Sequence, residues 1–192
     1  MSLTPDGALM QKLSPDRYGA VAQSAHWLTV LLLVGAFTLG FTMTEMAMSP
    51  TRLKLYAYHK WIGVTVFALV ALRLLWRLLK GAPAYPATMA PWERRLAGLT
   101  HGLLYLLLFA APLSGWLMSS AKGFQTVYFG VLPLPDLLAK DKELGHLLED
   151  VHELLTSTML GLVALHLAAV VKHQFLDRDG VLRRMLPRRL MP

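Results

Sequence analysis

The residues of this sequence best suited to chemistry are its histidines. The chain of 192 residues has seven of them and no cysteine, which excludes disulfides, iron–sulfur clusters and thiol chemistry. In the stretch VHELLTSTMLGLVALH, residues 151–166, a histidine lies near each end of a largely apolar run. The fourteen residues from His152 to His166 turn a helix through about 1400°, about 40° short of four turns, and rise about 21 Å. Both imidazoles therefore project from nearly the same helical face, at two levels.

The elements that would position these histidines are four long apolar segments. They lie near residues 22–43, 58–79, 96–118 and 151–171, in a chain that is 55 % hydrophobic and 16 % charged. A bilayer core requires about 20 apolar residues per helix, and stretches such as LTVLLLVGAF lack the polar face that a soluble bundle would show. We therefore predict an all-α fold, an integral membrane four-helix bundle, as a single domain over residues 1–192. The first segment starts well inside the chain and lacks a small-residue cleavage site, so we expect it to be retained.

The basic residues predict the orientation of the bundle. All but six of the 19 Lys and Arg residues lie on the side that holds both termini and the loop between the second and third segments. Because basic residues near helix ends stay cytoplasmic, we predict that both termini lie in the cytoplasm. This anchoring accounts for most of the net charge of +7, so we do not expect nucleic-acid binding.

The predicted topology matches four histidines in depth. His26, near the start of the first segment, lies at the cytoplasmic level of His166. His59, near the start of the second, lies at the outer level of His152. Polar groups inside a membrane are costly and usually carry function. Two imidazoles at each level suit the two axial positions of a haem iron, and the macrocycle suits an apolar bundle. We predict two stacked haems, the inner one bound by His26 and His166 and the outer one by His59 and His152.

Other interpretations of the histidines stay open. A zinc or copper ion normally takes three or four close ligands, and each level offers two well-placed ones, so this interpretation is weaker. Hydrogen-bonded core histidines without a ligand are the structural alternative. His101, at the cytoplasmic start of the third segment, could replace or assist His26, or contact a propionate or a quinone. We expect His146 and His173 to be surface or interfacial groups.

Three residues near the predicted ligands also invite interpretation. Arg73, fourteen residues after His59, shares its face at the cytoplasmic level and could bind a haem propionate or an anionic substrate, or reach to the interface instead. Arg77 is expected to reach to the interface. Gly63, four residues after His59, could let a macrocycle lie against the helix or could serve helix packing.

Two local features predict departures from four simple spans. Pro112 lies inside the third segment and should kink it unless a neighbouring helix satisfies the freed carbonyl. The stretch PDLLAKDKELGHLLED, residues 135–150, has helical spacing. We expect it to form an amphipathic helix at the outer surface.

Assembled in this order, these residues resemble the bacterial cytochrome b561 family of small membrane cytochromes. The resemblance covers most of the chain and rests on SAHW, YHKWIGVTVFALVALRLLWRL, THGLLYLLLFAAPLSGWLMSS and VHELLTSTMLGLVALHLAAVVKH. It implies two b-type haems whose iron ligands match His26, His59, His152 and His166. The histidine and proline that the family carries in its third helix are His101 and Pro112. The resemblance also implies a location in the bacterial inner membrane and a membrane quinone as redox partner. For one branch of the family it implies superoxide oxidation on the outer side.

The leading functional hypothesis is therefore transmembrane electron transfer by an oxidoreductase that couples an outer one-electron donor, such as superoxide, to ubiquinone. Outer basic residues such as Lys60 could attract a small anion, although seven acidic residues lie on the same side. The alternative is a haem-b membrane-anchor subunit of a dehydrogenase or hydrogenase, which would dock a partner through residues 119–150 or the basic tail. A haem-free transporter or scaffold is a third hypothesis.

Overall fold

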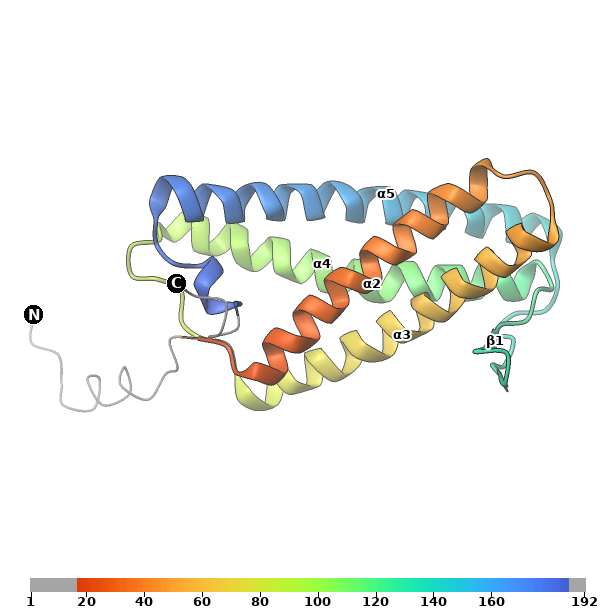
Figure 1. Cartoon of the computed structure of the whole chain (residues 1–192), viewed down its shortest axis with the longest axis horizontal. Coiled ribbons are helices and arrows are strands. Elements are labelled where there is room, and N and C mark those ends of the chain that lie inside the picture. The colour runs from red at the N-terminus through yellow and green to blue at the C-terminus, as the bar shows by residue number, and fades with distance from the viewer. Residues whose placement is uncertain (1–16, 187–192) are drawn as a thin grey trace, which may run out of the picture.

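The part of the chain that the structure describes, residues 17–186, is dominated by four long helices (Figure 1). In this computed structural model they are α2 (Ala20–Glu45), α3 (Pro50–Lys80), α4 (Pro91–Ala121) and α5 (Lys142–Lys172). All four are long and apolar enough to cross a membrane. Many of their large apolar side chains face outward, such as Leu31, Leu72 and Leu106, as expected of helices whose solvent is lipid. The predicted all-helical membrane bundle is confirmed, while the cytoplasmic placement of the termini stays a prediction.

The helices pack as neighbours in chain order. α2 lies against α3, α3 against α4, and α4 against α5. The buried core between them is formed by Val66 and Val70 of α3, Leu107 and Leu108 of α4, and Met159 of α5. We call the end of the bundle where α2 and α4 begin the terminal end, and the opposite end, where α3 and α5 begin, the loop end.

Each helix extends beyond its predicted boundaries, and in α3 and α5 a side chain caps the first turn. Ser49 accepts a hydrogen bond from the backbone N–H of Arg52 and starts α3. Asp141 accepts one from the N–H of Leu144, at 3.0 Å, and starts α5. Such caps satisfy backbone donors that have no partner within the helix. Pro112 lies inside α4, which continues as a helix to its last residue, and the predicted kink stays a prediction.

The expected surface helix over residues 135–150 is wrong in its extent. Its second half forms the first turns of α5, because the Asp141 cap starts one helix that runs on without a breaker. Before this cap lies a short antiparallel hairpin of β1 (Val127–Tyr128) and β2 (Leu132–Pro133), in which Val127 pairs with Pro133. The long loop is therefore a structured hairpin at the loop end.

After α5 the chain folds back beneath the terminal end of the bundle. A π-helical turn (His173–Asp177) and a 3-10 turn (Leu182–Arg184) lead to contacts with α2. The side chains of Gln23 and Trp27 donate hydrogen bonds to the carbonyls of Arg184, at 3.1 Å, and Met185, at 2.9 Å. The rest of the predicted basic tail, residues 187–192, lies outside the described residues.

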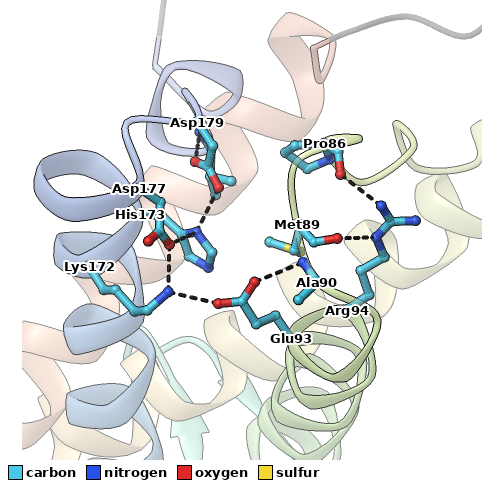
Figure 2. Close-up of polar contacts among 10 residues, drawn as sticks. Pro86, Met89, Ala90, Glu93, Arg94, Lys172, His173, Asp177 and Asp179 are labelled. Carbon is cyan, nitrogen blue, oxygen red and sulfur yellow. Dashed lines mark hydrogen bonds and ion pairs between the residues drawn. The ribbon is translucent and has the colours of Figure 1, made fainter.

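A polar cluster fastens this returning segment to α4 and α5 (Figure 2). Lys172 Nζ donates to Glu93 Oε1 at 2.7 Å and to Asp177 Oδ2 at 2.6 Å. His173 Nδ1 lies 2.7 Å from Asp179 Oδ2 and 3.0 Å from Asp177 Oδ2. The exposed fraction of His173 is only 9 %, because the fold-back buries it between carboxylates. The expectation that it is a surface group is therefore wrong, while an interfacial position stays a prediction. His146, by contrast, is exposed beside Glu149.

Candidate functional site

At the loop end, the structure brings His59 of α3 and His152 of α5 together. Their ring centroids are 6.2 Å apart and their planes are nearly perpendicular, at 87°. If both imidazoles bound one metal ion through bonds of about 2.0 Å, their ring centroids would lie roughly 6 Å apart. The spacing therefore fits a metal ion held between the two rings.

Backbone carbonyls orient both rings. His59 Nδ1 lies 3.0 Å from the carbonyl oxygen of Ala36, and His152 Nδ1 lies 3.0 Å from that of Ala111. The Ser114 hydroxyl donates to the Ala111 carbonyl and lies 3.0 Å from the same Nδ1. Because a carbonyl only accepts, each Nδ1 carries the proton and each Nε2 keeps a free lone pair. Histidines that bind metals are held in this way by a second partner.

The two histidines line an apolar cavity. Its volume is about 120 Å³, and it is partly open to the surroundings. Gly63 and Gly115 lie on its wall. A Cβ at Gly63 would meet no atom within 4 Å, whereas one at Gly115 would lie 3.1 Å from His152 Cε1. Gly63 thus borders open cavity and not a tightly packed helix, and Gly115 leaves room for the imidazole.

At the terminal end, three helices bring histidines to one level. His166 of α5 stacks edge-on against His101 of α4, with ring centroids 5.3 Å apart. His101 Nδ1 lies 2.7 Å from the carbonyl oxygen of Ala97, which leaves its Nε2 free. His26 of α2 lies close enough to both rings to interact with them electrostatically. The ring contact that the structure gives His166 is therefore with His101, and not with its predicted partner.

The predicted partner, His26, contacts an arginine. Arg73 Nη2 lies 3.1 Å from His26 Nδ1, and its guanidinium lies 5.5 Å from the centre of the Tyr105 ring. Since a guanidinium only donates, Nδ1 of His26 accepts and Nε2 carries the proton. This is the opposite tautomer from that of the other oriented histidines. Arg77 also lies over the Tyr105 ring, at 5.9 Å, so both arginines contact the bundle.

Sequence reasoning missed the groups that surround the histidines. The Ala36 and Ala111 carbonyls and the Ser114 hydroxyl come from other helices than the rings they hold, and helical spacing does not reveal such contacts. Glycine inside a helix is a signal that could have found two neighbours of the rings, because it costs about 1 kcal/mol relative to alanine. A Cβ at Gly40 would lie 3.6 Å from His59 Cε1, and Gly115 contacts His152 more closely still.

Four membrane-length helices that hold histidines at two levels define a multi-pass membrane protein of the cytochrome class. The chain belongs to the prokaryotic cytochrome b561 family, whose model it matches over residues 17–188. It is 33 % identical to cytochrome b561 homolog 2 of Escherichia coli (strain K12) over 174 residues, 90 % of this chain and 93 % of that protein. It is 26 % identical to cytochrome b561 homolog 1 of the same organism over 183 residues, 91 % of this chain and 99 % of that protein.

A third similar protein is the probable superoxide oxidase CybB of Yersinia pestis. Its identity to this chain is 25 % over 173 residues, 90 % of this chain and 97 % of that protein. The predicted family is confirmed, and membership in it implies b-type haem.

Proposed function

We propose that this protein transfers electrons across the membrane through two b-type haems. The observation that carries the proposal is the loop-end pair: His59 and His152 face one another beside an apolar cavity, each with its Nδ1 on a carbonyl. With their Nε2 atoms free, His59 and His152 would hold the iron of a haem. Haem b bound there would supply a centre that accepts and releases one electron at a time.

The second haem would lie at the terminal end, with His166 as one ligand. About 21 Å of rise along α5 separates His166 from His152, so the two haems together would cover most of a hydrocarbon core about 30 Å thick. The sequence predicts His26 as the second ligand, whereas the contact with His166 and the free Nε2 support His101. Whichever of His26 and His101 does not bind the iron would stay near Arg73. There it could contact a quinone or a haem propionate.

The proposed donor is superoxide at the loop end, and the proposed acceptor is a membrane quinone. Oxidation of one superoxide ion yields dioxygen and one electron, so two superoxide ions and two protons convert one quinone into quinol. The name of the Yersinia relative supports this donor. Lys60 lies on the cavity wall, where its positive charge would attract a small anion. Glu149 is paired with Lys122 at 2.6 Å, so these two charges of the loop end offset one another. With the termini in the cytoplasm, the loop end would face outward.

The first experiment is the visible spectrum of the purified protein. We expect a Soret band that responds to dithionite and two haems per chain. His152→Ala and His166→Ala should each remove about half of the haem, while the exposed His146→Ala should keep all of it. His26→Ala and His101→Ala then separate the two assignments, because the terminal-end haem should be lost only when its actual ligand is replaced. A protein without a dithionite-sensitive Soret band would disprove the proposal. Superoxide consumption with added quinone tests the donor and the acceptor.

A further inference from the structure

The hairpin at the loop end is unusually apolar for a segment outside the helices. Residues 123–135, GFQTVYFGVLPLP, contain no charged residue and no histidine. Four of their large side chains are more than half exposed: Phe124 at 63 %, Phe129 at 61 %, Val131 at 83 % and Leu132 at 56 %. In a loop surrounded by water, polar side chains would be more favourable at such exposed positions. An exposed apolar patch of this kind marks an interaction surface.

The turn of the hairpin also presents an aromatic side chain at a position where it is unfavourable. Phe129 has φ 50° and Gly130 has φ 72°, the left-handed pair of a tight hairpin turn, for which Asn-Gly is the preferred sequence. A bulky residue in this region is strained. Phenylalanine there is a poor choice for forming the turn, and its apolar surface offers a reason for its presence.

The hairpin lies beside α3 and not beyond its end (Figure 1). Lys60 Nζ donates to the carbonyl of Phe124 at 2.9 Å, and Trp61 Nε1 to that of Val127 at 2.7 Å. The Thr65 and Tyr128 hydroxyls lie 2.8 Å apart. α3 begins at Pro50, so these contacts lie about 15–22 Å along the helix from its first residue.

This position coincides with the expected edge of the hydrocarbon layer. The basic residues Arg77 and Lys80 close α3 at the terminal end. The twenty residues from Trp61 to Lys80 rise about 30 Å, which is about the thickness of the hydrocarbon core. Tryptophan is also typical of this boundary, and a second one, Trp116, donates to the carbonyl of Pro135 at 3.1 Å.

We propose that the hairpin, residues 124–134, docks on the lipid leaflet at the loop end. Phe129, Val131 and Leu132 enter the region between the headgroups and the acyl chains. Because the hairpin carries no charge, phospholipid itself is the partner and anionic headgroups are not required. Thr126 of the same hairpin is buried and lines the loop-end cavity, so docking also holds this wall of the cavity in place. The inference rests on the membrane-spanning helices and is independent of the proposed electron transfer.

The absence of cysteine from the chain makes a depth measurement direct. Val131→Cys, labelled with a nitroxide in nanodiscs of phosphatidylcholine, reports its accessibility to oxygen, which concentrates in lipid, and to a water-soluble nickel chelate. Glu143→Cys, exposed in the first turn of α5, is the aqueous control, and Leu160→Cys, 42 % exposed midway along α5, is the hydrocarbon control. We expect the oxygen-to-nickel ratio of Val131→Cys to exceed that of Glu143→Cys severalfold. Equal ratios, or low accessibility to both reagents because protein covers the label, would overturn the proposal.

A second variant tests whether apolar contact causes the docking. With a label at Leu132→Cys, adding Val131→Asp should move the ratio to the aqueous value, while circular dichroism shows an unchanged helical content. Replacing part of the neutral lipid by phosphatidylglycerol should leave the ratio of the parent protein unchanged. A reporter that stays in lipid despite the aspartate, or that requires anionic lipid, would contradict the proposed contact.

Discussion

Replacing Gly115 by alanine tests the loop-end site with a single methyl group. The added Cβ would lie 3.1 Å from His152 Cε1 and 3.3 Å from its Nδ1, closer than ordinary van der Waals contact. The ring must shift by a few tenths of an ångström. Its Nδ1 is already held at 3.0 Å from the Ala111 carbonyl, so the shift weakens the hydrogen bond that orients the imidazole.

The structure allows the size of the effect to be worked out. Disturbing a partner that orients a metal ligand typically costs 10- to 100-fold in affinity, which is about 1.4–2.7 kcal/mol. The helix itself gains about 1 kcal/mol when alanine replaces glycine. We therefore expect Gly115→Ala to leave the stability of the haem-free protein unchanged or slightly higher. Its affinity for haem at the loop end should fall about 10- to 100-fold.

Haem titration of the haem-free protein, followed at the Soret band, measures both affinities. Gly161→Ala is the matched control, because a Cβ there would meet nothing within 4 Å and Gly161 is exposed on α5. It should leave both affinities unchanged. If Gly115→Ala bound two haems as tightly as the parent protein, the close contact with His152 would not constrain a ligand. If it weakened both sites equally, the effect would be global and not local.

Further substitutions address the other contacts of the bundle. Ser114→Ala should lower the loop-end haem affinity by less than tenfold, because the Ala111 carbonyl still accepts a hydrogen bond from His152. Haem titration measures this affinity, and a larger loss would show that the Ser114 hydroxyl is the main partner of the ring. Arg73→Met removes the contact with His26. In low-temperature difference spectra it should change only the signal of the terminal-end haem. A change in the signal of the loop-end haem would contradict the separation of the two levels. Glu93→Gln should leave the melting temperature nearly unchanged, because its partner Lys172 is 41 % exposed and exposed ion pairs contribute little to stability. Thermal unfolding with unchanged haem content checks this.

Several features followed from local sequence because they depend on one segment at a time. Uninterrupted apolar runs identify membrane helices without reference to their neighbours. The helical repeat alone places His152 and His166 on one face. The helix boundaries were harder to predict from the sequence. Ser49 and Asp141 are residue types that cap helices, but the apolar composition placed the starts of α3 and α5 several residues after their observed first residues. The first turns of both helices are polar and lie outside the apolar runs.

Contacts between segments were decided by the tertiary structure. The sequence by itself determined an all-helical membrane protein of the cytochrome b561 family with histidines at two depths. Only the packing decided that His166 contacts His101 while His26 contacts Arg73. The packing also decided that carbonyls of neighbouring helices orient His59 and His152. It likewise decided that the fold-back after α5 buries His173. The physical reason is that a helical repeat specifies how side chains lie around one axis. The rotation and offset of one helix against another depend on side-chain packing across the whole bundle.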